Sequence, residues 1–252
     1  MSPRYTRLTD SQWQNIKPLL DTQRKRKYDL REILNALLWL VRTGCQWRNM
    51  ESSFPPWKTV YYYFERWSKD GTLEKINQKL NCLEREGIGR SGKPSLGIAD
   101  SQSVKLLPMS FQDRGIDGNK LINGRKRHLL TCTLGRIWKV HVHAANEHDS
   151  PAGVNLLHWG KLEMKRLKKI VADKAYRGTF AREVKARNIK FEVPKRSKDQ
   201  KGFVVETRRW VVERTFAWLN FYRRVTMDYE KTTRSATNFL YLANISMVLN
   251  AL

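Results

Sequence analysis

The sequence SLGIAD at residues 95–100 returns in a related form as KKIVAD at residues 168–173. Each segment runs small and apolar residues into an aspartate, a pattern that predicts a buried strand ending at a carboxylate. Functional sites on α/β sheets are built where strands end. If the two strands are neighbours in one sheet, Asp100 and Asp173 meet at its edge and repel each other unless a cation lies between them.

Further strands and helices surround these two segments. Alternating hydrophobicity predicts strands at residues 127–134, 138–145 and 189–193. Helical spacing of apolar residues predicts helices at residues 151–165 and 179–188. Gly135 marks a hairpin turn between the strands on either side of it. The element order predicts an α/β fold, a ribonuclease H-like mixed sheet flanked by helices.

The last helix is predicted from FVVETRRWVVERTFAWLNFYRRVTMDYEK, residues 203–231, which has no Gly or Pro and is apolar over most of its circumference. At about 100° per residue, one narrow polar stripe interrupts the apolar surface. The stripe is formed by Glu206, Arg209, Glu213, Asn220 and Arg224. Since a buried acid needs a partner or a metal ion, we expect Glu213 to meet the two aspartates.

Three carboxylates without His or Cys make a hard oxygen site suited to Mg²⁺ or Mn²⁺. Two such ions roughly 4 Å apart would activate a water or a 3′-hydroxyl and stabilise the leaving oxygen during attack on a phosphodiester. Each residue also has a plain structural interpretation. An aspartate after a strand commonly caps a turn or a helix, and Glu213 with Arg209 one turn away is also an ordinary i, i+4 pair.

Composition narrows the class of protein. The 252 residues include 48 Lys and Arg against 24 Asp and Glu, and the formal charge of +24 indicates a polyanionic partner, usually nucleic acid. A ribosome-like or merely adhesive basic protein is the alternative, but nine Trp favour a folded body. Three scattered Cys indicate neither a disulfide framework nor a structural zinc site. With no apolar signal core or membrane-spanning run, we expect a cytoplasmic, nucleoid-associated protein without a membrane partner.

Short helices are predicted in the first part of the chain, with boundaries marked by Thr9, Gln12, Asp29, Gly44, Pro55 and Pro56. The helix after Pro56 leaves a basic and aromatic outer face that includes Lys58 and Arg66. This pattern resembles a helix-turn-helix DNA reader, although a small helical bundle with a solvated basic face has the same pattern.

Glycines at positions 87, 89 and 92 interrupt the periodicity. We therefore predict two domains. Residues 1–86 are expected to form an N-terminal all-α, helix-turn-helix-like domain that binds DNA. Residues 95–252 are expected to form the ribonuclease H-like catalytic domain.

Four segments in order resemble a bacterial insertion-sequence transposase of the DDE type, in particular the insertion-sequence-five-like family. They are ADSQSVK (99–105), DGNKLINGRKRHLLTCTLG (117–135), VADKAYRG (171–178) and RRWVVERTFAWLNFYRRVTMDYEK (208–231), and the likeness extends to GCQWR (44–48). The resemblance implies that Asp100, Asp173 and Glu213 bind divalent metal. It also implies cleavage at the ends of a mobile element, joining of those ends to target DNA, and a homodimer that brings the two terminal inverted repeats together.

The chain departs from the family pattern on the last helix. The family signature there has Tyr, two residues, Arg, three residues, Glu, six residues and Lys. Arg209 and Glu213 match it, whereas Glu206 stands at the Tyr position and Asn220 at the Lys position. Arg224 is the expected replacement for the missing cation.

Several basic residues are predicted to contact DNA. They are Arg209, Arg224, Lys105, Arg125, Lys126, Arg127, His128, Lys58 and Arg66. The run from Arg125 to His128 begins a strand, where it would either hold phosphates near the site or form a solvated basic edge. His141 and His143 alternate with valines, which favours a partly buried pair over metal ligation.

Together these features predict a DNA transposase that cleaves at insertion-sequence ends and joins them to target DNA by two-metal chemistry. Two alternatives remain at this point. One is a noncatalytic DNA-binding protein derived from a transposase, and the other is a simple Mg²⁺-dependent nuclease.

Overall fold

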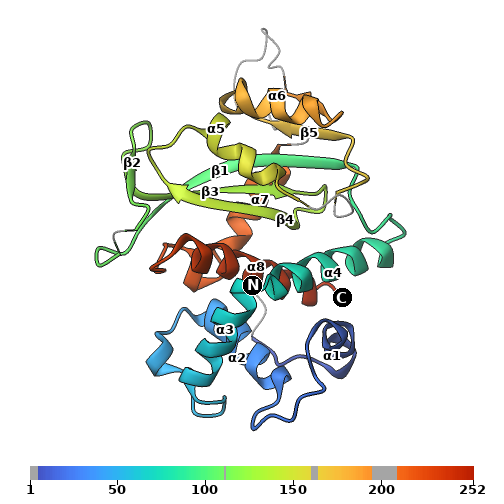
Figure 1. Ribbon diagram of the computed structural model, residues 1–252, viewed down its shortest axis with the longest axis vertical. Coiled ribbons are helices and arrows are strands. Elements are labelled where there is room, and N and C mark those ends of the chain that lie inside the picture. The colour runs from blue at the N-terminus through green and yellow to red at the C-terminus, as the bar shows by residue number, and fades with distance from the viewer. Residues whose placement is uncertain (1–4, 111, 160–163, 195–208) are drawn as a thin grey trace.

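A computed structural model describes residues 5–110, 112–159, 164–194 and 209–252. Its α-helices are α1 (Asp10–Ile16), α2 (Leu30–Thr43), α3 (Trp57–Lys69), α4 (Thr72–Gly87), α5 (Asp149–Gly153), α6 (Thr179–Ala186), α7 (Trp210–Leu219) and α8 (Thr233–Leu249). Its strands are β1 (Leu96–Lys105), β2 (Gly115–Asp117), β3 (Ile122–Thr131), β4 (Ile137–Ala144), β5 (Lys169–Ala172) and β6 (Lys190–Glu192). These elements form layers, with α5 and α6 on one side of the sheet and α4, α7 and α8 on the other (Figure 1). Helices α1, α2 and α3 lie beyond that second layer.

Strand β1 lies in the middle of the sheet. It pairs antiparallel with β3 and parallel with β5, which in turn pairs parallel with β6. Strand β3 also pairs with β2 and β4. The prediction of a mixed α/β sheet flanked by helices is therefore confirmed. So is the β3–β4 hairpin, whose turn uses Gly135 at a φ of 80°.

Helix α5 is much shorter than the helix predicted at residues 151–165. Helix α5 ends at Gly153, a 3₁₀ turn η3 (Val154–Leu157) follows, and His158 leaves the helical backbone region. A Cβ on Gly153 would lie 2.7 Å from the Tyr176 ring, so the helix approaches that ring more closely than a larger residue allows. The prediction of one long helix was wrong. Part of that range, residues 160–163, lies outside the described residues.

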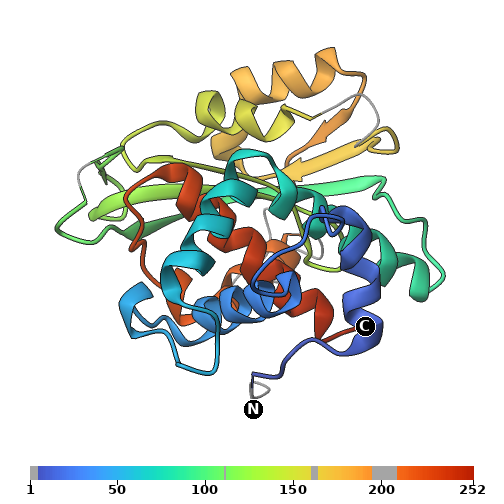
Figure 2. The same ribbon diagram turned by 60° about the horizontal axis from the view of Figure 1, so that its bottom comes forward.

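Helix α8 is a buried element that the sequence patterns did not reveal. It is apolar around most of its circumference, so no single face shows a period. It packs against α2, α3, α4 and β4, and Figure 2 shows it running through the middle of the N-terminal helices. It therefore packs against the sheet on one side and forms the core of the N-terminal helices on the other.

Three buried asparagines fasten this layer to the sheet. The side-chain amides of Asn77 and Asn81 both donate to the carbonyl of Ile137, each at 2.8 Å. Asn244 of α8 accepts the Ile137 N–H at 2.9 Å and donates to Asn77 and Asn81 at 2.6 and 3.0 Å. Because all three side chains are buried, this closed network fixes α4 and α8 against β4.

Helices α1 and α2 begin where their capping residues predict. Thr9 and Gln12 form a complete capping box on α1, and Asp29 caps α2. Helix α2 ends at Gly44, whose φ of 72° and close approach to Arg223 both require glycine. One hydrophobic cluster extends from Leu8 to Leu249, across the break predicted at residues 87–94. The two-domain division and the helix-turn-helix assignment stay predictions.

The prediction that one helix runs from residue 203 to residue 231 was wrong at its C-terminal end. Residues up to 208 lie outside the described residues, α7 ends at Leu219, and Tyr222 has extended backbone angles. Arg224 then lies in a separate 3₁₀ turn, η5 (Arg223–Val225). Asp228 exchanges backbone hydrogen bonds with the β1 end, donating to Lys105 and accepting from Leu107, each at 2.9 Å. Long-range pairing thus bends the chain where the sequence contains no Gly or Pro.

No helix in the described part of the chain is long and apolar enough to cross a membrane.

Candidate catalytic site

The two predicted aspartates lie side by side. Ala99 of β1 is the parallel register partner of Ala172 of β5, and Asp100 and Asp173 are the next residues of the two strands. Pairing with β5 ends there, but β1 itself continues to Lys105, so Asp100 is not at the strand end that the sequence predicted. The Asp173 side chain accepts the Ala175 N–H at 2.8 Å and so caps the turn η4 (Lys174–Tyr176).

Arg209 joins the third predicted carboxylate to this pair. It directly precedes α7, and its Nη2 lies 3.5 Å from Asp100 Oδ2 and 3.4 Å from Glu213 Oε1. Helix α7 is held in this place by Thr215, whose hydroxyl donates to the carbonyl of Gly135 at 2.8 Å. The Glu213 side chain is 54% exposed and the Asp100 side chain 14%, so the group opens to solvent on the Glu213 side.

Burial changes the acidity of Asp100. Desolvation raises its pKa to about 6, and the negative charge of Asp173 acts in the same direction. The Ser101 N–H, which donates to Asp100 Oδ1 at 2.8 Å, and the charge of Arg209 oppose this rise. An ionised Asp100 beside Asp173 is therefore a place where added positive charge is stabilising.

The donor chemistry fits a divalent metal of the Mg²⁺ type, because all three side chains offer carboxylate oxygens. Within the four described ranges, however, no three His, Cys, Asp or Glu side chains lie close enough together to hold an ion. Arg209 lies between Asp100 and Glu213 and supplies the positive charge between them. An ion held by all three carboxylates would therefore need them closer together than they lie here.

Four of the predicted DNA-contacting side chains lie inside the protein. Arg125 is fully buried, with bonds to Asp228 and to the carbonyls of Gln112, Glu230 and Lys231. Arg127 donates to the Val225 carbonyl at 2.6 Å and to Gln102. Lys126 pairs with Asp149 at 2.9 Å, and His128 is fully buried. Alternation along β3 sends these side chains into the two packed layers, so as placed they do not reach DNA.

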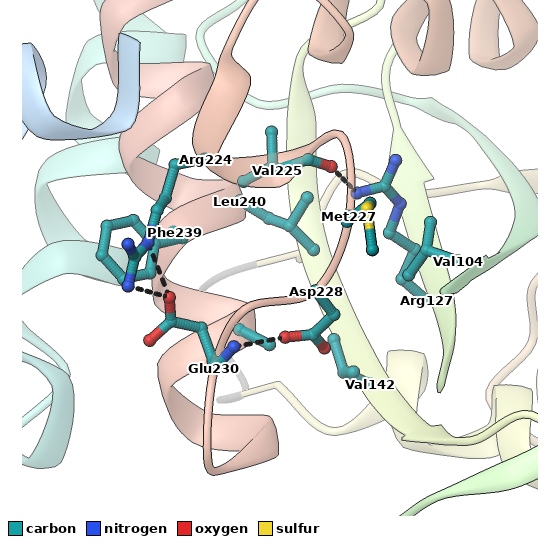
Figure 3. Close-up of a pocket in the computed structure, with 11 residues that line it drawn as sticks. Val104, Arg127, Val142, Arg224, Val225, Met227, Asp228, Glu230, Phe239 and Leu240 are labelled. Atoms are coloured by element: carbon teal, nitrogen blue, oxygen red, sulfur yellow. Dashed lines mark hydrogen bonds and ion pairs between the residues drawn. The ribbon is translucent and has the colours of Figure 1, made fainter. Parts of the chain in front are cut away.

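Arg224 is also internal. It pairs with Glu230 at 2.7 Å beside a cavity of about 20 Å³ whose lining includes Arg127 and Asp228 (Figure 3). The cavity has room for about one water molecule and not for a substrate. The expectation that Arg224 extends the polar stripe of Glu213 was wrong, because the two residues are on different elements. Glu206 lies outside the described residues, and Asn220 is the C-cap of α7.

The remaining predicted contacts stay accessible. Lys58, Arg66 and Lys105 are exposed, and Arg209 is half-buried beside the carboxylates. One residue near the site was missed by sequence reasoning. Tyr176 is fully buried beside His128, and its signal was its position inside the motif VADKAYRG. Asp149 is half-buried on the other side of His128, with its Oδ1 3.9 Å from His128 Nε2.

Comparison with known proteins adds to this geometry. A family model described as "Transposase DDE domain" matches residues 91–249, more than half of the chain. The chain belongs to the DDE transposase family. A second model, described as "Putative transposase of IS4/5 family", matches residues 8–77. The two matches together support an IS4/IS5-like DDE transposase, as the sequence motifs predicted.

The DDE family implies a ribonuclease H-like fold, and the mixed sheet of this transposase-family chain agrees with it. A curated relative, the "Uncharacterized protein y4sN" of Sinorhizobium fredii, is 32% identical over 83 residues. The match covers 31% of this chain and 64% of the relative, so the chain spans less than two thirds of that protein's length. No solved structure matches the chain.

Proposed function

We propose that this protein is a DNA transposase that cleaves at the ends of an insertion sequence and joins those ends to target DNA. The proposal rests above all on one observation. Parallel pairing of β1 and β5 sets Asp100 next to Asp173, and Arg209 links Asp100 to Glu213. Membership in the DDE family supports the same chemistry.

Asp100 and Asp173 are the proposed principal ligands of Mg²⁺ or Mn²⁺, and Glu213 is the third. Two bound ions would lower the pKa of a water or a 3′-hydroxyl and neutralise charge on the leaving oxygen. Asp100 contributes as the carboxylate, which predominates above its pKa of about 6. Arg209 is the proposed contact for the phosphate next to the cleaved bond once it leaves Glu213.

Double-stranded DNA is the proposed partner, both as terminal inverted repeats and as target. Lys105 and Arg209 are the proposed phosphate contacts near the site, and Lys58 and Arg66 are those of the N-terminal helices. A formal charge of +24 supports strong and salt-dependent binding at the nucleoid. A homodimer is proposed because two ends must be held together for joining.

The test is a nicking and strand-transfer assay with Mg²⁺ and a DNA fragment that carries the ends of the encoding element. Asp100→Asn and Glu213→Gln are expected to lower the nicking rate on the order of a thousandfold. Glu183→Gln is the matched control, since Glu183 of α6 pairs with Arg187 at the surface. Thermal unfolding of each variant checks that it is folded.

The products separate the alternatives. Nicked and joined products that vanish in the two site variants support a transposase. Nicking without joining favours a simple nuclease, and end binding without cleavage by the wild type favours a noncatalytic DNA-binding derivative. Unchanged products from Asp100→Asn would overturn the assignment of the site.

A further inference from the structure

Tyr176 joins two strands on either side of the proposed site. It is the last residue of η4, which begins directly after Asp173. Its oxygen lies 2.5 Å from His128 Nδ1 on β3. Because β3 and β5 lie on either side of β1, this contact bridges the central strand. It does so at Ser101, which is the register partner of His128 and the residue after Asp100. The mechanism proposed above uses neither Tyr176 nor His128.

The Tyr176 ring is closely packed. It is fully buried, and its centroid lies 5.0 Å from that of the Phe180 ring on α6 and 5.5 Å from that of the His128 ring. Gly153 of α5 lies so near that a Cβ there would be 2.7 Å from a ring carbon of Tyr176. A phenylalanine would fill the same space. The buried hydroxyl, in contrast, needs a polar partner, and His128 supplies it.

The contacts of His143 set the direction of this hydrogen bond. His143 Nδ1 lies 2.8 Å from the carbonyl oxygen of Ala144, which only accepts, so this nitrogen carries a hydrogen. A neutral His143 then accepts at Nε2 from His128 Nε2, 2.7 Å away. A neutral His128 in turn accepts at Nδ1, so the Tyr176 hydroxyl donates to it. Burial lowers the pKa of both histidines, which keeps them neutral at pH 7.

The other end of this connection is the carboxylate of Asp173. Its Oδ1 accepts the Ala175 N–H at 2.8 Å, and its main-chain carbonyl accepts the Tyr176 N–H at 3.4 Å. Both bonds lie within the turn η4 that Tyr176 ends. The turn holds the Asp173 carboxylate, and Tyr176 holds the turn against β3. Listed from one end to the other, the connection runs from Asp173 through η4 and Tyr176 to His128.

The position of this connection gives it a role. Pairing of β1 with β5 stops one residue before the two aspartates, so the ladder itself does not hold the strand ends that carry them. Two carboxylates that share Mg²⁺ must keep a fixed separation, because the ion demands oxygen ligands at about 2.0–2.1 Å.

We propose that Tyr176 and His128 are positioning residues, which brace the end of β5 against β3 across β1 and so fix the separation of Asp100 and Asp173. The consequence for metal binding rests on the proposed function. The brace itself, the hydrogen bond from Tyr176 to His128, does not.

Imidazole ¹⁵N NMR tests the brace without DNA or metal. The protein has five histidines, so selective ¹⁵N-histidine labelling gives few signals, and His128→Gln assigns those of His128. We expect the hydrogen of His128 on Nε2 at pH 7. Tyr176→Phe should move the Nδ1 signal toward that of an imidazole nitrogen that accepts no hydrogen bond. A hydrogen on Nδ1, or an Nδ1 signal that Tyr176→Phe leaves unchanged, would overturn the brace.

Binding of Mn²⁺ to the DNA-free protein tests the positioning role, with electron paramagnetic resonance measuring free Mn²⁺ and Asp173→Asn identifying the site. Tyr176→Phe and His128→Leu should each raise the Kd about tenfold. The double variant should bind no more weakly than either single one, because both changes remove the same contact. His128→Gln keeps an acceptor and should stay near the wild-type Kd.

Phe180→Leu is the matched control for loosened packing. It removes the ring that packs against Tyr176 and keeps the hydroxyl and its partner. Urea denaturation should show a less stable fold, whereas the Kd for Mn²⁺ should stay near that of the wild type.

The two proposals fail in different ways. A wild-type Kd in folded Tyr176→Phe, or equal losses of affinity in Tyr176→Phe and Phe180→Leu, would refute the positioning role alone. A wild type that binds Mn²⁺ with the expected order of variants but never nicks DNA would refute the proposed function and leave the positioning role standing. A wild type that binds no Mn²⁺ would refute the proposed metal site and the role in metal binding, and the NMR result would still decide whether the brace exists.

Discussion

The two faces of β1 and β3 bury polar groups in opposite ways. Toward α7 and α8, Asp100 and Arg125 are charged and form ion pairs with Arg209 and Asp228. Toward α5, His128 forms hydrogen bonds to Tyr176 and to His143. One pair of strands thus carries a charged layer that opens at the proposed site and, toward α5, a buried neutral group of histidines next to the Lys126–Asp149 ion pair.

The two faces differ in what their buried polar groups require. A buried charge needs a partner of opposite sign, and a buried neutral group needs only a donor or an acceptor. The charged face therefore depends on intact pairs. The neutral face depends on the histidines remaining unprotonated. Each face should fail under a different perturbation.

The largest effect is expected from breaking the charged face. Arg125→Met leaves Asp228, with a side chain only 5% exposed, without its ion-pair partner 3.1 Å away. We expect a loss of about 3–5 kcal/mol in the free energy of unfolding, measured by urea denaturation. The control is Arg187→Met, which breaks a surface pair and should cost less than about 1 kcal/mol. Similar losses in both variants would contradict the central role of Arg125.

Lowering the pH should destabilise the fold through the buried histidines on the α5 side of the sheet. Burial lowers the folded-state pKa of His128 and His143 below the ordinary value of 6.5. The unfolded chain therefore binds more protons as pH falls, so stability is full above pH 6.5 and is lost below it. We expect a loss of roughly 2 kcal/mol by about pH 5.5, since each histidine contributes up to about 1.4 kcal/mol per pH unit. Urea denaturation from pH 7.5 to 5 measures it, and His128→Gln should flatten the curve.

Asp100 should change the pH dependence of the free energy of unfolding in the opposite direction. Its folded pKa of about 6 exceeds the ordinary 3.8, so its carboxylate destabilises the fold as pH rises through this range. We expect Asp100→Asn to raise the free energy of unfolding at pH 7 on the order of 2 kcal/mol and to change little at pH 4. Thermal unfolding at the two pH values checks this. A destabilised Asp100→Asn at pH 7 would show that its pair with Arg209 outweighs the desolvation.

The sequence predicted the helices, the strands and the aspartate pair better than it predicted the contacts between distant residues. Capping residues located α1 and α2, and the repeated Asp at the ends of GIAD and IVAD identified a carboxylate pair that the sheet register does bring together. These signals are local, or depend only on two strands being neighbours.

The failures share a physical cause. The bend after Leu219 and the burial of α8 are set by contacts distant in sequence, such as Asp228 with the end of β1. The run from Arg125 to His128 looked like a basic surface because charge in a sequence does not reveal its partner. Arg125 is balanced by Asp228, 103 residues away, and His128 by Tyr176, 48 residues away.

The smallest effect on stability is expected at the Tyr176 hydroxyl. Tyr176→Phe keeps the buried ring and removes the hydroxyl that is hydrogen-bonded to His128 Nδ1. The expected loss in the free energy of unfolding is about 1 kcal/mol, the usual net contribution of one neutral hydrogen bond. Urea denaturation at pH 7.5 measures it. A loss as large as that of Arg125→Met would show that the neutral hydrogen bond matters as much as the buried ion pair.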